Sequence, residues 1–437
     1  MIIRHNIKPY RSNSFIRVLA VMPCLLLLLV LGFATTPANA SQPNLPPAGN
    51  YTSIAAAPGG GFWVQLQTPG NSSDYRTLAI DGAPEYESVN EAGSIVAVPG
   101  TNGYWVVTVT GGIHARGAPE LCSGHLSNCS GYHSNNGYIT GAAASPNGQG
   151  LWAVDSARHL WTAGNVPALG DVTGDNRTPT GIAATPSGQG YYIVMDDGGV
   201  HARGDAVFYG STGGNRPGGH DLVGIALSHD ITGAVDGYWL VGSDGGVYTF
   251  GSATFLGSTG GAGRGAVSNI VTRPEGRSYA WVRADGQVGK SQDAPPITLK
   301  SITQGKVIDV PGGSMEPGTP LQLAAANGSA SQKWKIVPPV PYVAGAMRLV
   351  NVNSGLCMDL EGNSVSGRVL QYACKTPIQQ WQNQLWMPVK AGNGEIQFKL
   401  FSHQDYRLYG YPDEYGAGLI LSFHTNAGLD WDVIPAP

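Results

Sequence analysis

Charged side chains are scarce in this chain of 437 residues, since Asp, Glu, Lys and Arg together make up only 12%. No run of basic residues occurs, and 29 acidic residues outnumber 25 basic ones, which argues against nucleic acid as a partner. The sequence also lacks a phosphate-binding loop, a Gly-x-Ser-x-Gly elbow and a His-Glu-x-x-His helix. We therefore expect no cofactor and no resident metal, and we assign no catalytic residue.

Long hydrophobic runs are also missing, except at the N-terminus. Residues 1–40 join four basic residues to an apolar run over 18–33 and end in Thr-Pro-Ala-Asn-Ala. This order predicts a secretory signal peptide that is cut after Ala40 and followed by a linker at 41–48. An uncut membrane anchor is the alternative, but the run is shorter than the ~20 residues of a spanning helix. We expect a secreted chain without a membrane span after cleavage.

Cysteine is rare, with five residues, of which one lies in the predicted signal peptide. The other four lie in two close pairs, Cys122 with Cys129 and Cys357 with Cys374. An even number in an exported chain predicts disulfides. A zinc site is the alternative for the first pair, because His125 and His133 stand at spacings that zinc could use.

Glycine, in contrast, is abundant at 63 residues, and it belongs to a repeat. The stretch GYWLVGSDGGVYTFGSATFLGSTGG at 237–261 is echoed at 190–214 and 103–118, and three weaker copies occur. One position recurs every 40 to 47 residues, at Trp63, Trp105, Trp152, Tyr192, Trp239 and Ala280. Short runs of β-branched and aromatic residues around an Asp-Gly turn favour strands over helices.

Each copy is expected to form three strands and a short outer strand, the last one near 253–258 in the fifth copy. Six such units over 49–292 predict a six-bladed β-propeller, although a seventh blade closed by a strand from elsewhere stays open. The copies resemble the Trp-Leu-Val/Asp-Gly-Gly repeats of exported bacterial proteins, which implies a propeller-like architecture and no particular activity.

A different repeat follows an Ala-Pro-Pro linker. Residues 297–310 align without a gap on 347–360, which places Asp309 on Asp359. Further matches join 318–325 to 367–374 and 331–334 to 383–386, and a third, degenerate copy ends the chain. Three units of strands predict a threefold barrel. The expected fold is therefore all-β, with a six-bladed β-propeller followed by a β-trefoil.

These units resemble the ricin B-type lectin β-trefoil, whose Gln-x-Trp signature stands at Gln332-Lys333-Trp334 and Gln384-Leu385-Trp386. The resemblance covers 293–437. It implies carbohydrate binding by an Asp, an aromatic platform and an Asn-Gln pair. A carboxylate and amides suit sugar hydroxyls, and an aromatic ring covers the apolar face of a pyranose.

The middle repeat matches every part of that pattern, with Asp359, Tyr372, Asn383 and Gln384 as the predicted sugar-binding residues. Cys357 and Cys374 stand where the family has an internal disulfide. In the first repeat, Asp309 and Gln332 remain, but the position of Tyr372 holds Leu323, so this repeat offers at most a second, weak site. In the third repeat, the Asp position holds Gly410.

These observations predict a secreted carbohydrate-binding protein with a glycan or polysaccharide as its ligand. The propeller is expected to display the trefoil or to bind a cell-surface protein. A secreted glycoside hydrolase or lyase, with its active site on a propeller face and the trefoil as substrate anchor, is one alternative. Most carboxylates of the blades stand at expected turn positions, which disfavours it. An extracellular scaffold with a degenerate lectin is the other alternative.

Overall fold

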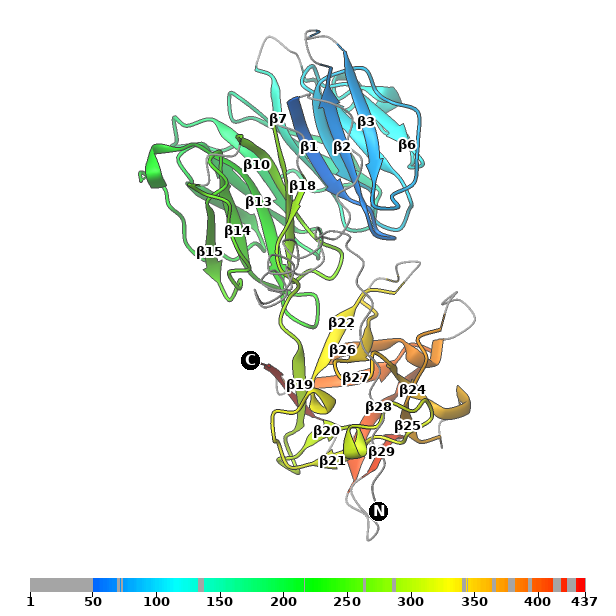
Figure 1. Cartoon of the computed structure of the whole chain (residues 1–437). Coiled ribbons are helices and arrows are strands. Elements are labelled where there is room, and N and C mark those ends of the chain that lie inside the picture. Colours follow the sequence, from blue (N-terminus) through cyan, green and yellow to red (C-terminus); the bar gives the residue numbers. More distant parts are fainter. Residues whose placement is uncertain are drawn as a thin grey trace, which may run out of the picture. The chain divides into compact units, whose positions relative to one another are not determined.

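The structure is a computed structural model, and it describes residues 50–68, 71, 74–132, 137–215, 217–261, 265–284, 288–339, 343, 345–363, 367–375, 382–391, 395–411, 418–422 and 430–436. The predicted signal peptide and linker, 1–40 and 41–48, lie outside these residues. Strands dominate the described chain (Figure 1), so the all-β prediction is confirmed. Within these residues, no helix is long and apolar enough to cross a membrane.

Residues 50–290 form six antiparallel sheets of three consecutive strands each, counted over the described chain. The sheets are β1 (Asn50–Ala56), β2 (Phe62–Gln67), β3 (Tyr75–Ile80); β4 (Gly93–Ala97), β5 (Tyr104–Thr108), β6 (Ile113–Arg116); β7 (Ile139–Ala144), β8 (Gly150–Asp155), β9 (Leu160–Gly164); β10 (Pro179–Ala184), β11 (Gly190–Met195), β12 (Val200–Gly204); β13 (Leu222–His229), β14 (Val235–Gly242), β15 (Val247–Gly251); and β16 (Val267–Thr272), β17 (Tyr279–Arg283), β18 (Val288–Lys290). Each sheet corresponds to one predicted repeat.

The middle strand of each sheet carries the repeated position, which is aromatic in five sheets and Ala280 in the sixth, and is almost wholly buried. Such strands are apolar on both faces, as expected where sheets pack face to face. The indole N–H of each repeated tryptophan donates to a carbonyl in the loop after the third strand, at 2.7 to 2.8 Å, in the pairs Trp63 to Pro84, Trp105 to Pro119, Trp152 to Pro167 and Trp239 to Thr254.

The first strands of neighbouring sheets lie beside one another, and β16 of the sixth sheet lies beside β1 of the first. β7 and β10 are irregular near Gly141 and Gly181. A Cβ atom on Gly141 would stand 3.3 Å from Gly181 Cα, and one on Gly181 would stand 3.3 Å from Gly224 Cα. Backbones can approach this closely only because these positions have no side chain.

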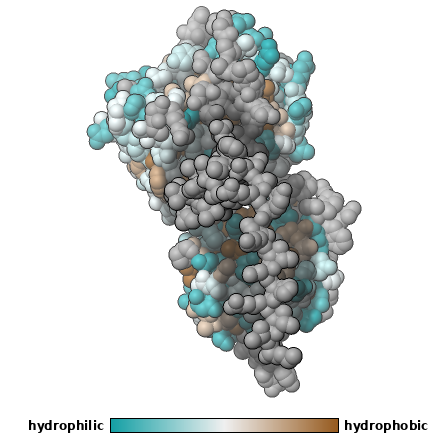
Figure 2. Space-filling view, in the orientation of Figure 1, coloured by the Kyte–Doolittle hydropathy of each residue, from teal (hydrophilic) through white to brown (hydrophobic). Residues whose placement is uncertain are grey.

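Apolar clusters fill the spaces between sheets. In the cluster that joins the sixth sheet to the first, Ala280 and Val282 of β17 pack with Ile54 of β1 and Val64 of β2. On the face drawn in Figure 2, the described surface over the six sheets is mostly white to teal. Most large apolar side chains of the described sheets are buried between them, whereas Tyr138, Phe208 and Phe255 are exposed.

The predicted outer strand of the fifth repeat is wrong, because residues 253–258 form no strand. Their backbone bonds to side chains instead. Thr254 accepts from the Trp239 indole, the Leu256 N–H donates to the Tyr279 hydroxyl, and that hydroxyl donates to the Gly257 carbonyl. The segment thus links the fifth and sixth sheets rather than extending β15.

Twelve further strands in the described chain hydrogen-bond into one sheet. They are β19 (Ile297–Ser301), β20 (Val307–Asp309), β21 (Gln322–Ala324), β22 (Trp334–Val337), β23 (Arg348–Asn351), β24 (Cys357–Leu360), β25 (Val369–Tyr372), β26 (Trp386–Lys390), β27 (Ile396–Leu400), β28 (His403–Tyr411), β29 (Gly418–Ser422) and β30 (Trp431–Pro435). The strand order, with four strands for each predicted repeat, is consistent with a trefoil. None of the six three-stranded sheets closes on itself within the described chain.

Helices are limited to short turns in the described chain, namely η1 (Cys122–Gly124), α2 (Ser127–Ser130), η3 (Pro217–Gly219), η4 (Pro311–Gly313), η5 (Ala330–Gln332), η6 (Glu361–Asn363) and η8 (Gln382–Gln384).

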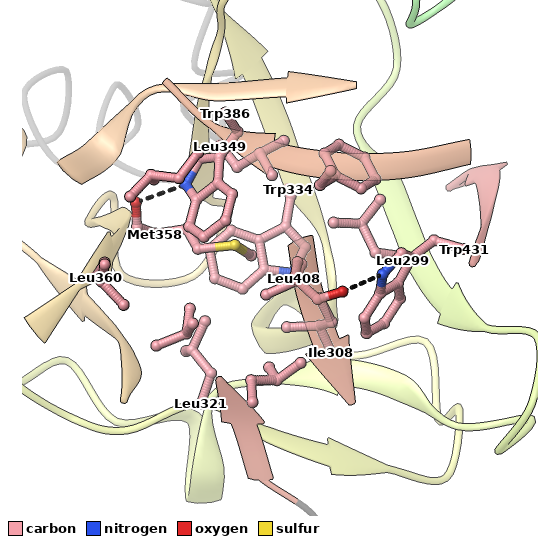
Figure 3. Close-up of a cluster of buried hydrophobic side chains, with 14 of the residues drawn as sticks. Leu299, Ile308, Leu321, Trp334, Leu349, Met358, Leu360, Trp386, Leu408 and Trp431 are labelled. Atoms are coloured by element: carbon pink, nitrogen blue, oxygen red, sulfur yellow. Dashed lines mark hydrogen bonds between the residues drawn. The ribbon is translucent and has the colours of Figure 1, made fainter. Parts of the chain in front are cut away.

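Three tryptophans at equivalent places form the centre of the twelve-stranded sheet's core (Figure 3). Trp334, Trp386 and Trp431 begin β22, β26 and β30, and each is at most 1% exposed. The Trp386 indole donates to the Met358 carbonyl at 3.0 Å, and the Trp431 indole donates to the Leu408 carbonyl at 3.2 Å. Each repeat therefore contributes one large apolar side chain to a shared core.

Candidate functional site

A cavity of about 680 Å³ opens over β24 and β25. In the register of these two strands, Asp359 lies opposite Leu370 and Cys357 lies opposite Tyr372. Met358 and Leu360, the neighbours of Asp359, pack into the core. Because side chains alternate along a strand, Asp359 faces away from the core. The cavity is lined by Gly318, Asp359, Glu361, Gly362, Leu370, Tyr372, Ala373, Cys374 and Lys375.

The Asp359 carboxylate is 2% exposed and is held by three donors. Its Oδ1 accepts from Asn383 Nδ2 at 2.7 Å, and its Oδ2 accepts from Gln384 Nε2 at 2.7 Å. Lys375 Nζ lies 2.7 Å from the same Oδ2. Burial raises the pKa of the Asp359 carboxyl above its ordinary value, while Lys375 and Gln384 act in the opposite direction. Hydrogen bonds from Asn383 and Gln384 thus fix the orientation of the Asp359 carboxylate, and the Lys375 ammonium group offsets part of its charge.

The two amides are themselves fixed in orientation. Asn383 Nδ2 also donates to the Leu360 carbonyl at 2.8 Å. Gln384 Nε2 donates to the Ala373 carbonyl at 2.9 Å, and its Oε1 accepts from the Lys375 N–H at 2.9 Å. Both residues are buried, and neither lines the cavity. They therefore position Asp359 instead of facing the cavity.

Tyr372 is 44% exposed and lines the same cavity. Lys375 Nζ lies 5.1 Å from the centroid of its ring, within the range of a cation–π contact. Of the four residues predicted for the middle repeat, Asp359 and Tyr372 thus line the cavity, while Asn383 and Gln384 bond to the Asp359 carboxylate. Lys375 was not predicted, because the pattern of Asp, aromatic ring and amides does not include a lysine.

Both predicted disulfides are present. Cys357 is bonded to Cys374, which ties β24 to the segment that carries Lys375. Cys122 is bonded to Cys129, so their sulfurs are not the thiolates that zinc needs. His133, the last residue of the alternative zinc set, lies outside the described residues.

The first repeat does not reproduce this arrangement. Asp309 Oδ1 accepts from Ser331 Oγ at 2.8 Å, and its Oδ2 accepts from Gln322 Nε2 at 2.9 Å. Gln332 bonds elsewhere, since its Nε2 donates to the Ala325 carbonyl at 3.0 Å. No hydrogen bond among the described residues joins Asp309 to Gln332, the predicted weak pair.

The strand register also corrects the alignment of this repeat. Asp309 lies opposite Gln322, whereas Asp359 lies opposite Leu370. The counterpart of Tyr372 is consequently Ala324, one residue after the predicted Leu323. Leu323 packs in the core, and neither residue offers an aromatic platform.

The third repeat needs a similar correction. The Trp431 indole bonds the Leu408 carbonyl as the Trp386 indole bonds the Met358 carbonyl, so the residue after Leu408 is the counterpart of Asp359. That residue is Tyr409 and not Gly410. Gly410 faces the core, where a Cβ atom would stand 2.7 Å from Leu323 Cδ1. Neither Tyr409 nor Gly410 supplies a carboxylate.

Two aspartates of the six sheets accept hydrogen bonds from the backbone of their own turns. Asp155 Oδ1 accepts from the N–H groups of Ala157 and His159, and Asp244 Oδ1 accepts from the Gly246 N–H. These bonds explain the aspartates by local backbone chemistry.

A family model described as a ricin-type beta-trefoil lectin domain-like family matches residues 280–381. The chain thus contains a ricin B-type lectin domain in its C-terminal region. The match includes Asp359 and Tyr372 and ends before Asn383. No protein of curated function matches the chain.

Several solved structures are similar in part. The Rhizoctonia solani agglutinin shares 21% identity over 33% of this chain and 97% of its own, with a TM-score of 0.28. A Macrolepiota procera ricin B-like lectin in complex with lactose shares 14% over 33% and 99%, with a TM-score of 0.26. An exo-beta-1,3-galactanase from Clostridium thermocellum shares 13% over 90% and 96%, with a TM-score of 0.29. Scores this low support no argument about fold or ligand.

Proposed function

We propose that the protein is a secreted carbohydrate-binding protein. In this proposal, a ricin B-type β-trefoil over 293–437 binds a glycan at Asp359. A six-bladed β-propeller over 49–292 displays the trefoil or binds a cell-surface protein. The single observation that carries the proposal is the cavity in which a fixed carboxylate, an exposed tyrosine ring and a lysine converge.

The chemistry of these groups suits a sugar. A carboxylate offers about four lone-pair positions. Asp359 uses three of them, so a sugar hydroxyl can donate to the remaining one. The exposed ring of Tyr372 offers an apolar face to the C–H side of a pyranose. Lys375 adds a charged donor for sugar oxygens, which forms stronger hydrogen bonds than a neutral donor.

The propeller and the secreted state have their own support. Each predicted repeat forms one three-stranded sheet, and the first strands follow one another from β1 through β16, which lies beside β1 again. Such a succession is expected of blades arranged around an axis. Two disulfides are typical of a chain that leaves the reducing cytoplasm.

A glycan array tests the proposal with the wild-type chain and Asp359→Asn. The variant keeps the size of the side chain but turns one acceptor oxygen into an amide donor that faces the donors of Asn383, Gln384 and Lys375. We expect the wild type to bind a defined class of glycan and the variant to lose that binding. Asp309→Asn is the matched control, because Asp309 occupies the same place in a repeat without a platform, and it should bind normally.

Thermal unfolding of all three proteins separates binding from folding. Unchanged binding by a folded Asp359→Asn variant would overturn the assignment of the site. Failure of the wild type to bind any glycan would overturn carbohydrate binding and favour the scaffold.

A further inference from the structure

We propose that the Asp359 site takes an oligosaccharide rather than a single sugar, with a loop of the first repeat, residues 314–319, as the wall for the second sugar. Gln371 is the positioning residue that holds this loop. The inference rests on the proposed carbohydrate binding and specifies its ligand.

Gln371 lies in β25 between two residues of the cavity, Leu370 and Tyr372, and points the other way. Its side chain is fully buried. The Nε2 group donates to the carbonyls of Ser314 at 2.9 Å and Glu316 at 3.1 Å. Each of these bonds links the second repeat to the loop of the first.

The backbone of Gln371 holds the same loop. The Gly318 N–H donates to the Gln371 carbonyl at 2.7 Å, and the Gln371 N–H donates to the Thr319 carbonyl at 3.0 Å. The loop therefore lies along the edge of β25 like an additional short strand. This position explains why Gly318 lines the cavity together with Leu370 and Tyr372.

Further contacts brace the loop. Asn353 Nδ2 donates to the Gly313 carbonyl at 2.9 Å, just before the loop begins. Within the loop, the Thr319 hydroxyl donates to the Glu316 carbonyl at 2.7 Å. A wall fixed at several points loses little conformational entropy when a ligand binds against it.

The size of the cavity points to more than one sugar. A hexose has about a dozen non-hydrogen atoms and fills roughly 200 Å³ at the packing density of protein interiors. The cavity measures about 680 Å³. Leu370, Gly318 and Glu361 also line the cavity and can bound the space that one sugar on Asp359 leaves. Each oxygen of the Glu361 carboxylate accepts from Arg368, at 3.0 and 3.2 Å, and keeps a lone pair for a hydroxyl of the second sugar.

The first repeat shows that this wall is a special feature of the second. By the strand register, the counterpart of Gln371 is Leu323, which packs in the core and has no amide to hold a loop. The same side of this strand is therefore used for packing in one repeat and for fixing a cavity wall in the other.

Titration calorimetry tests the inference with glucose, galactose, xylose and N-acetylglucosamine, each alone and as its β-1,4-linked disaccharide and tetrasaccharide. An added sugar that makes two or three net hydrogen bonds should tighten binding roughly tenfold in the series that the site accepts. Gln371→Leu should abolish this gain and leave the affinity for the single sugar unchanged.

A second variant avoids the buried position. Gly318 has a φ of +87° and no atom within 4 Å of a Cβ built on it, and asparagine tolerates such backbone. Gly318→Asn should therefore fold, project a side chain from the wall and reduce the affinity for oligosaccharides alone. Gln322→Leu makes the same chemical change in the first repeat, away from the cavity, and as a control should change neither affinity.

The outcomes are distinguishable. Binding of a single sugar without any gain for longer chains would overturn the inference and leave the carbohydrate-binding function intact. A gain that survives both Gln371→Leu and Gly318→Asn would also overturn it. No binding in any series would overturn the proposed function and the inference together.

Discussion

Replacement of each core tryptophan by phenylalanine should reveal unequal costs at three equivalent positions. Trp386 and Trp431 donate their indole N–H to the carbonyls of Met358 and Leu408 (Figure 3). The buried indole N–H of Trp334 has no hydrogen-bond partner among the described residues. The perturbation therefore removes the same packing volume at each site but a hydrogen bond at only two.

The magnitudes follow from these contacts. Loss of part of the ring system leaves a comparable cavity at all three sites and should cost about 1–2 kcal/mol each. At Trp386 and Trp431, a buried carbonyl loses its partner, which adds about 1–3 kcal/mol. At Trp334 the substitution removes an unpartnered buried donor, so no such addition arises. Trp334→Phe should consequently be the mildest of the three by about 1–3 kcal/mol.

Differential scanning calorimetry measures the Tm of each variant. The relevant unfolding transition is the one that all three substitutions shift. For a domain of this size, each kcal/mol should lower Tm by about 4 °C. We expect the Trp386→Phe and Trp431→Phe transitions to lie several degrees below that of Trp334→Phe. Equal shifts in all three variants, or the largest shift at Trp334, would refute the reasoning.

Further predictions concern the disulfide Cys357–Cys374 and the loss of glycan binding at acidic pH. Joint replacement of Cys357 and Cys374 by serine should destabilise the C-terminal sheet by about 3 kcal/mol, because the bond closes a loop between residues 17 apart, and unchanged chemical denaturation would contradict this. Glycan binding should fall in an acid titration with a midpoint above 3.8, because burial raises the pKa of Asp359 from that value and the protonated acid loses its ion pair with Lys375. The same raised pKa makes this group favour the folded state more as pH falls, so protonation of Asp359 does not by itself cause unfolding. Lys375→Gln should move the midpoint to higher pH, and an unchanged midpoint would argue against the ion pair.

The repeats made much of the fold predictable. A position that recurs every 40 to 47 residues, aromatic in five of the six repeats, located the middle strand of every sheet, because such strands need apolar residues on both faces. The outer strand was predicted wrongly, because that prediction too rested on local composition. The apolar residues near 253–258 indicate a strand by composition, but their backbone is bonded by the Trp239 and Tyr279 side chains, which lie elsewhere in the sequence.

The sequence predicted which residues gather around Asp359 but not how they are arranged, and their role in sugar binding stays a prediction. A gap-free alignment located Asp359 and the amide pair. It missed the one-residue differences that make Ala324 and Tyr409 the true counterparts, because strand register is set by pairing across the sheet. The ion pair with Lys375 and the wall held by Gln371 depend on loops that meet only in the folded chain.

Each of the six sheets is made from one continuous stretch of chain, and the sixth meets the first through side chains, with Val282 packed against Ile54 and Lys290 paired with Asp81. No strand from one end of the chain completes a sheet begun at the other end, within the described residues. A gene for such an array can therefore gain or lose a whole unit by duplication or deletion without changing the strand pairing of any other sheet. It can equally be cut at another loop and rejoined at its ends, and the resulting permuted chain would carry the same sheets in a new order.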